Sequence, residues 1–115
     1  MQVESFSFGR ITIDGKEYTS DVIVSKDSMV NSSWWRKEGH NVHPEDIGEI
    51  IDASPEIVIF GTGANGSMKV SNAVKEQLQQ KGINVDQMLT SKAKDKFNEL
   101  VKEGRKAVLA AHLTC

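Results

Sequence analysis

The chain has 115 residues, 38% hydrophobic and 26% charged, which is enough apolar material for one core and argues against disorder. Its formal net charge of −2 argues against a general nucleic-acid binder, which would carry a basic stripe. No apolar run reaches the roughly 20 residues of a membrane span, no targeting leader is recognisable, and Cys115 is the only cysteine, so we expect one cytoplasmic domain over residues 1–115 with no nucleic-acid or membrane partner.

The start of the chain predicts an N-terminal antiparallel β-hairpin. Apolar and polar residues alternate around residues 6–13, with a bulge expected at Gly9. Asp14-Gly15 is a strong two-residue hairpin turn, and the return strand is expected over about residues 16–24. The polar segment 25–33 is expected to be a loop.

The middle of the chain predicts a short strand and a helix. Trp34-Trp35-Arg36 is compatible with a short strand, followed by a loop over residues 39–43. Pro44 fits the first position of a helix, where its missing N–H costs nothing. Glu45 and Asp46 would lie in the first turn, where the helix dipole favours negative charge.

The second half of the chain alternates strands and helices. Residues 57–60 form a continuous apolar run, as expected for a strand covered on both faces. The expected order is strand 57–60, helix 70–81, strand 83–85, a helix capped by Thr90 or Ser91 that ends at Gly104, and strand 107–111. This β-α-β rhythm predicts parallel strands joined by right-handed crossovers, and hence an α/β domain.

A glycine-rich turn is the first candidate binding site. Gly61-Thr62-Gly63-Ala64-Asn65-Gly66 matches G-x-G-x-x-G after a buried strand, and Asp86 follows twenty residues later, as in a dinucleotide site. Three residues separate the last glycine from the helical face, however, and the chain is short for a dinucleotide-binding domain. Two interpretations stay open: a packing turn, or a small-molecule, anion or nucleotide site at which Lys69 or Arg105 neutralises the ligand.

Other polar residues give weaker signals. His40, His43 and Asp46 are possible zinc ligands by type, but no Cys pair or H-E-x-x-H accompanies them, so surface and capping roles are expected and no metal. His112 and Cys115 would face opposite sides of a strand, which argues against a nucleophile pair. We therefore expect His112 to be a buried, hydrogen-bonded residue at a strand end, and predict no catalytic residue and no cofactor.

Trp34, Trp35 and Arg36 are the candidate interface residues. Adjacent strand residues face opposite ways, so one tryptophan is expected to pack inside and the other to be exposed. Trp and Arg are enriched at binding hot spots. The alternative is that both tryptophans cover the edge of the core.

Taken in order, several of these features resemble one protein family. They are the apolar strand into Gly61-Thr62-Gly63, the helix with Thr90, Ala93, Phe97-Asn98 and Leu100, the ending Gly104-Arg105 and His112-Leu113-Thr114-Cys115, together with Asp14-Gly15, Asp21-Val22 and Trp35-Arg36. The family contains uncharacterised archaeal and bacterial proteins, the adipogenesis-associated protein and mitochondrial complex I assembly factor 3. The resemblance implies a three-layer α/β sandwich with a mixed central sheet plus the hairpin, and supplies no catalytic residue.

The resemblance and the tryptophans together favour a non-enzymatic binding or assembly module. Its expected partner is a protein, either a different chain or a second copy of this one. The alternative is a protein or enzyme that binds a small molecule or anion at the turn from Gly61 to Gly66.

Overall fold

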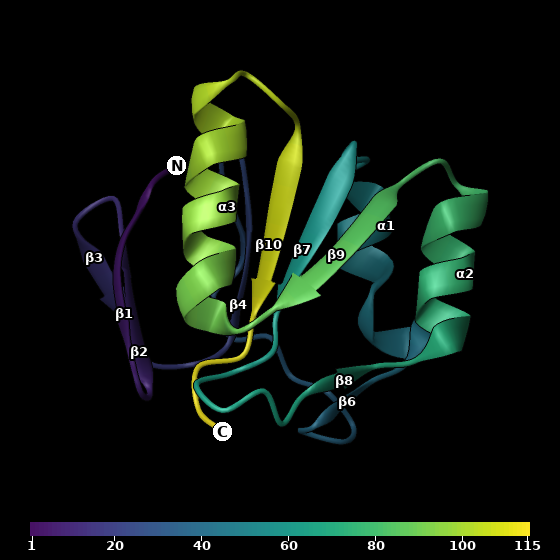
Figure 1. Ribbon diagram of the computed structural model, residues 1–115, viewed down its shortest axis with the longest axis horizontal. Coiled ribbons are helices and arrows are strands. Elements are labelled where there is room, and N and C mark those ends of the chain that lie inside the picture. The colour runs from purple at the N-terminus through teal and green to yellow at the C-terminus, as the bar shows by residue number, and fades with distance from the viewer.

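A mixed sheet forms the middle layer of the computed structural model, which describes residues 1–115 (Figure 1). Its five strands lie in the order β5-β4-β10-β7-β9. Strands β10, β7 and β9 are parallel to one another, and β4 runs antiparallel to both β10 and β5. The bounds are β4 Val22–Ser25, β5 Met29–Asn31, β7 Ile57–Gly61, β9 Asn84–Met88 and β10 Ala107–Ala111.

Two cores form on the two faces of this sheet because successive strand side chains point to opposite sides. Val58 and Phe60 of β7 pack on one face, in a cluster that includes side chains of α1 (Gly48–Asp52) and α2 (Asn72–Gln80). Ile59 lies on the other face, in a cluster that includes side chains of α3 (Thr90–Lys102). The prediction that the apolar run is covered on both faces is therefore confirmed.

The chain opens with a three-stranded antiparallel sheet made of β1 (Val3–Ser7), β2 (Arg10–Ile13) and β3 (Lys16–Tyr18). It packs beside α3, and the amide of Asn98 bonds to both backbone groups of Val3, at 2.8 and 2.7 Å. The predicted bulge at Gly9 is wrong, since Gly9 (φ +80°) lies in a turn that reverses the chain between β1 and β2. The predicted hairpin at Asp14-Gly15 is confirmed.

Several predicted boundaries differ from the structure. The return strand expected over 16–24 breaks after Tyr18, because β3 and β4 belong to different sheets. Residues 34–36 form no strand. Two loops contain short strands, β5 and β6 (Asn41–Val42), and β6 pairs with β8 (Lys69–Val70), which delays the start of α2.

The helices also begin differently from the predictions. Pro44 opens a 3₁₀ turn, Pro44–Asp46, that leads into the five-residue α1. Ser71 caps α2, with its hydroxyl accepting from the Val74 N–H. Leu89, rather than Thr90 or Ser91, stands at the N-cap of α3. The predicted α/β class, three layers and mixed sheet are confirmed. None of the helices has both the length and the apolar composition of a membrane span.

Candidate functional site

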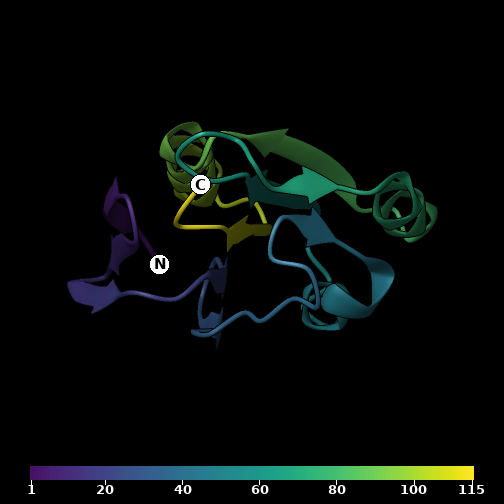
Figure 2. The ribbon, with the colours of Figure 1, turned by 90° about the horizontal axis from the view of Figure 1, so that it is seen from below.

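The carboxyl ends of β7, β9 and β10 meet at one end of the molecule, seen end-on in Figure 2. In open α/β sheets this is the end at which ligands usually bind. The β1–β2 turn reaches this end, because the Gly9 N–H donates to the Leu113 carbonyl at 2.8 Å. The loop after β5 also reaches it, because the Trp34 N–H donates to the Asp21 carbonyl at 2.7 Å.

A buried polar cluster of Asp21, Arg36 and His112 lies at this end. One carboxylate oxygen of Asp21, Oδ2, lies 2.7 Å from Arg36 Nη2 and 2.8 Å from His112 Nδ1. The other, Oδ1, accepts from the Leu113 N–H at 2.8 Å. The Arg36 side chain is only 3% exposed, so the cluster balances a buried guanidinium against one carboxylate.

Hydrogen bonding determines how the cluster is charged. Burial by itself raises the pKa of Asp21, but the hydrogen bonds from His112, Arg36 and Leu113 outweigh it and leave the pKa below its usual value. Arg36 Nη2 also donates to the Gly39 carbonyl at 2.7 Å, which with Asp21 accounts for its two hydrogens. His112 Nδ1 therefore carries the proton that Asp21 accepts.

This arrangement orients the His112 ring but gives it no reacting partner. The other ring nitrogen, Nε2, faces the Thr114 hydroxyl at a long 3.4 Å. The His40 ring meets the His112 ring edge-on, with 5.4 Å between centroids. His112 is buried at the strand end, as expected from the sequence, and its hydrogen bonds tie β10 to the segment before β4.

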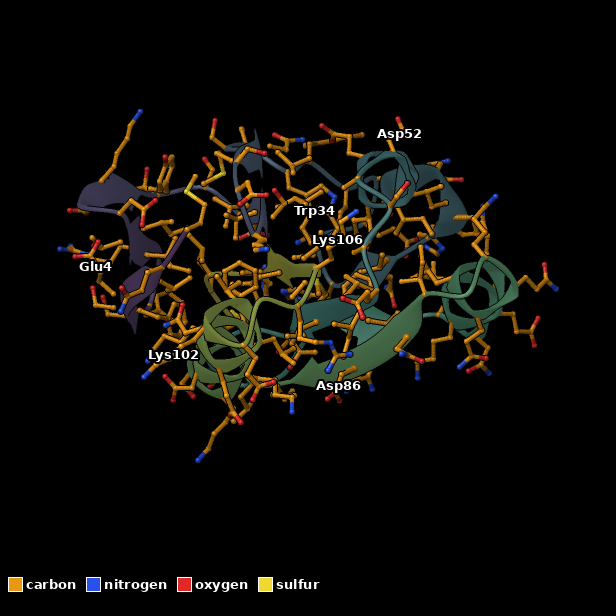
Figure 3. All side chains as sticks on the ribbon, turned by 90° about the horizontal axis from the view of Figure 1, so that it is seen from above. Glu4, Trp34, Asp52, Asp86, Lys102 and Lys106 are labelled. Atoms are coloured by element: carbon orange, nitrogen blue, oxygen red, sulfur yellow. The ribbon has the colours of Figure 1, made fainter.

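Arg36 fixes the loop that carries the two tryptophans. Its guanidinium stacks on the Trp34 ring, 4.5 Å from the ring centre. The Trp34 indole N–H donates to the Asp46 carbonyl at 3.1 Å, and Figure 3 places Trp34 inside the molecule. Arg36 Nη1 is buried without a protein partner, a position that an ordered water would satisfy.

Trp35 points the other way, into solvent. Its exposure is 77%, against 4% for Trp34 and 6% for Arg36. One tryptophan inside and one outside is the arrangement expected from the sequence. Arg36, however, is not a surface residue. Its guanidinium pairs with Asp21 and donates to the Gly39 carbonyl, so it holds the loop beneath Trp35 rather than contacting a partner.

The glycine-rich turn is filled by the chain itself. The Ala64 N–H donates to the Thr114 carbonyl at 2.7 Å, and the N–H groups of Asn65 and Ser67 donate to the Cys115 carbonyl at 3.1 and 3.0 Å. The Gly63 N–H donates to the Thr90 hydroxyl at 2.9 Å. Ligand binding at this turn stays a prediction, but these N–H groups do not point into an empty site.

Gly63 shows why the turn needs glycine. Its φ is +106°, and a Cβ there would lie 2.5 Å from the Cys115 carbonyl carbon, a clash that only glycine avoids. Of the two cations expected near the turn, Lys69 lies there, with Nζ 3.5 Å from the Gly66 carbonyl. Arg105 does not, because it precedes β10 at the opposite end of the sheet and pairs with Glu56 at 3.3 Å.

The large hydrophobic side chains that are exposed all lie at the same end of the molecule. They are Phe8, Trp35 and Leu89, exposed by 60, 77 and 41%. Phe8 lies in the β1–β2 turn, and Leu89 connects β9 to α3 beside Gly66. We call these three residues, with the Thr114–Cys115 segment, the carboxyl-end surface.

The histidines and the aspartate considered as metal ligands, His40, His43 and Asp46, do not come together. His43 Nε2 contacts Glu38 at 3.1 Å, whereas the Asp46 carboxylate accepts from the His43 backbone N–H at 2.8 Å. His40 lies against His112 instead. No group of three His, Cys, Asp or Glu side chains could hold a metal ion.

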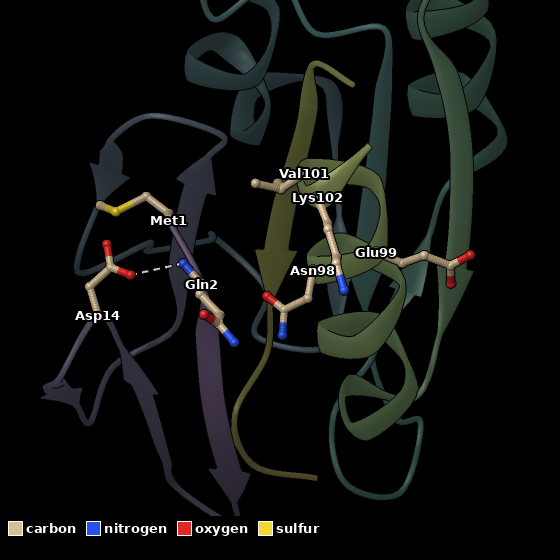
Figure 4. A pocket seen from close by; sticks show the side chains of 7 residues that line it. All are labelled: Met1, Gln2, Asp14, Asn98, Glu99, Val101 and Lys102. Carbon is tan, nitrogen blue, oxygen red and sulfur yellow. Dashed lines mark hydrogen bonds between the residues drawn. The ribbon is translucent and has the colours of Figure 1, made fainter. Parts of the chain in front are cut away.

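The largest groove, about 820 Å³, lies between β1 and α3 (Figure 4) and is lined by Met1, Gln2, Asp14, Asn98, Glu99, Val101 and Lys102. Five of the seven lining residues are polar or charged, and none belongs to the polar cluster or to the carboxyl-end surface. We therefore do not assign the candidate site to this groove.

Comparison with known proteins identifies relatives over nearly the whole chain. The family model described as "Protein of unknown function (DUF498/DUF598)" matches residues 3–112. A conserved hypothetical protein from Pyrococcus horikoshii OT3 has a TM-score of 0.83 at 23% identity, with 100% of both chains covered. The protein MT938 has a TM-score of 0.81 at 26% identity, with 99% of this chain and 98% of that one covered.

A third solved structure, an Mth938-like domain from a Bordetella pertussis protein, has a TM-score of 0.79 at 16% identity and covers 97% of this chain and 85% of that chain. At such low identity the likeness shows the fold alone.

Proposed function

We propose that this chain, which belongs to the DUF498/DUF598 family of proteins of unknown function, is a non-enzymatic binding module that holds a partner protein through Trp35. Because the family description gives no activity, the proposal rests on the site. The partner is a different chain or a second copy of this one, and we place the interaction in the cytoplasm.

The observation that carries this proposal is the exposure of Trp35 between two buried neighbours. Trp35 is 77% exposed, while Trp34 and Arg36 are buried on either side of it. A single exposed apolar residue is ordinary, but the buried neighbours of Trp35 hold its backbone in place before binding. Such preorganisation lowers the entropy cost of association, and tryptophan is the residue type most enriched at hot spots.

A small-molecule or anion site at the glycine turn has less support. The turn's N–H groups at Ala64, Asn65 and Ser67 already donate to Thr114 and Cys115. A ligand would have to displace that segment, and Arg105 lies too far along β10 to assist. The polar cluster, in turn, holds the tryptophan loop and offers no open substrate position.

Photocrosslinking tests the proposal directly. The photoreactive residue p-benzoylphenylalanine replaces Trp35 in one variant and the exposed Lys81, at the far end of α2, in a control variant. We expect irradiation in cells of the source organism to give a discrete protein adduct from position 35 and none from position 81. An adduct of twice the chain's mass would identify a second copy as the partner, and equal labelling from both positions, or none from either, would overturn the proposal.

A further inference from the structure

Lysines surround the carboxyl-end surface. Lys37 directly follows Arg36 in the tryptophan loop. The Lys69 N–H donates to the His40 carbonyl at 2.8 Å, and Lys92 lies in the first turn of α3 with its N–H bonded to the Leu89 carbonyl at 2.9 Å. All three lysines are exposed, and none forms an ion pair.

Lys92 stands where a helix normally favours a carboxylate. The positive end of the α3 dipole lies at this position, and Asp or Glu in the first turn stabilises a helix while Lys does not. The first turn of α3 contains no acidic residue. The positive potential of the helix start therefore adds to that of the lysine beside Leu89.

Three carboxylates at this end accept hydrogen bonds from groups of the chain itself. Asp21 is bonded to Arg36 and His112. Glu38 adjoins Lys37 and accepts from His43 at 3.1 Å and Asn41 at 3.0 Å. Asp86, three residues before Leu89, accepts from the Gln87 N–H at 2.9 Å. None of these carboxylates pairs with Lys69 or Lys92, so both ammonium groups are free to meet an incoming carboxylate, although the whole chain has a net charge of −2.

We infer that the partner of the carboxyl-end surface is a protein segment that combines acidic side chains with apolar ones. This inference rests on the proposed function. The apolar side chains cover Trp35 and Leu89, while carboxylates face Lys69 and Lys92. Complementary charge at the rim of an interface speeds association and selects the partner more than it adds affinity.

A protein segment fits this surface better than a nucleic acid. Two arginines lie at this end, and both already face carboxylates of the chain. Arg36 is buried and donates to Asp21 and Gly39, and Arg10, which follows the β1–β2 turn, lies 3.8 Å from Glu17, so the residue type best suited to bind phosphate is already paired. Glu38 follows the exposed tryptophan by three residues in the same loop, and its negative charge would repel a polyanionic backbone. A short acidic segment can place its carboxylates away from Glu38, whereas a regular row of phosphates cannot.

Peptide selection provides the test. A library of random 12-residue peptides displayed on phage is selected on the wild-type protein and counter-selected on Trp35→Ala. Enriched peptides are then synthesised with fluorescein, and their anisotropy is titrated with the wild type, with Lys69→Glu/Lys92→Glu, and with the control Lys81→Glu/Lys102→Glu. The controls replace exposed lysines at the opposite end of the molecule.

We expect enriched peptides rich in Asp, Glu and large apolar residues. Their affinity should fall at least tenfold in the Lys69→Glu/Lys92→Glu variant, change less than twofold in the control, and weaken as NaCl rises from 50 to 300 mM. Enrichment of basic or uncharged peptides would overturn the inference and leave the proposed function standing. No enrichment over Trp35→Ala would contradict both, and stronger binding of a fluorescent oligo(U) RNA than of any peptide would assign the surface to nucleic acid.

Discussion

Replacing Asp21 with Asn removes the one carboxylate that pairs with the buried Arg36. Arg36 cannot lose its proton, and its Nη1 already lacks a partner, so the variant would contain an uncompensated buried charge. Removing one partner of a buried pair costs about 3–5 kcal/mol. We expect the lower end, about 3 kcal/mol, because the Gly39 carbonyl still accepts from Arg36 and the Asn amide oxygen can still accept one hydrogen bond.

Scanning calorimetry at pH 7 measures this loss. For a domain of this size about 3 kcal/mol corresponds to a fall in Tm of roughly 10 °C. The matched control is Asp95→Asn, which breaks an ion pair with Lys94 of 2.8 Å in which the carboxylate is 68% exposed; it should lower Tm by no more than about 2 °C. Equal effects of the two substitutions would refute the view that the buried cluster anchors the tryptophan loop.

The pH dependence of the same variant checks the sign of the electrostatics. The pKa of Asp21 is lowered in the folded protein, so the ionised carboxylate stabilises the fold at pH values above its unfolded pKa of about 3.9. That contribution is lost as pH falls through this value towards the lower folded pKa. We therefore expect the stability difference between wild type and Asp21→Asn to stay constant from pH 7 to pH 5 and to shrink below about pH 4. A difference that already shrinks between pH 7 and pH 5 would contradict this assignment.

Three further predictions concern the turn, the first strand and the two tryptophans. Gly63→Ala should lower the free energy of unfolding by about 2–4 kcal/mol, because φ is +106° and the new Cβ would meet the Cys115 backbone. The control Gly104→Ala, with positive φ but nothing within 4 Å of the new Cβ, should lower it by about 1 kcal/mol. Equal losses of stability in urea titrations would show that the contact with the C-terminal segment contributes nothing. Asn98→Leu removes both hydrogen bonds to β1, so hydrogen exchange over residues 3–7 should speed up at least tenfold while β10 is unchanged; uniform speeding of both would mean global destabilisation instead. In an acrylamide titration, wild-type fluorescence should show one strongly quenched and one weakly quenched component, and Trp35→Phe should show only the weakly quenched one. Strong quenching of the variant would show that the remaining tryptophan, Trp34, is not buried.

Local chemistry was sufficient to predict much of the fold. The apolar run 57–60 and the strand 107–111 correspond closely to β7 and β10 because buried parallel strands need continuous apolar sequence. Gly82 and Gly104, both with positive φ, mark the helix ends as expected from their conformational freedom. The β1–β2 turn was missed because Phe8-Gly9 lacks the Asn-Gly or Asp-Gly signature that identified the turn at Asp14-Gly15.

The candidate site was only partly predictable because its hydrogen bonds join distant residues. Asp21 and His112 are 91 residues apart, and neither the position of β4 beside β10 nor their register can be read from local periodicity. The inward and outward orientation of Trp34 and Trp35 matches the prediction, but the predicted cause was strand alternation and residues 34–36 form no strand. The contacts that hold Trp34 inside are its hydrogen bond to the Asp46 carbonyl and its stacking with Arg36. The filling of the glycine turn could not be predicted, because the G-x-G-x-x-G pattern is the same whether its N–H groups meet a ligand or the chain's own carbonyls.

The affinity of the crosslinked partner for the purified protein tests the central claim most directly. Isothermal titration calorimetry compares wild type with Trp35→Ala, whose Tm should stay within about 2 °C of wild type because a 77% exposed side chain adds little to folding. We predict that Trp35→Ala raises Kd at least 30-fold, corresponding to a hot-spot loss of about 2 kcal/mol or more. Equal Kd values for the two proteins would contradict the claim that Trp35 is the residue through which this protein binds.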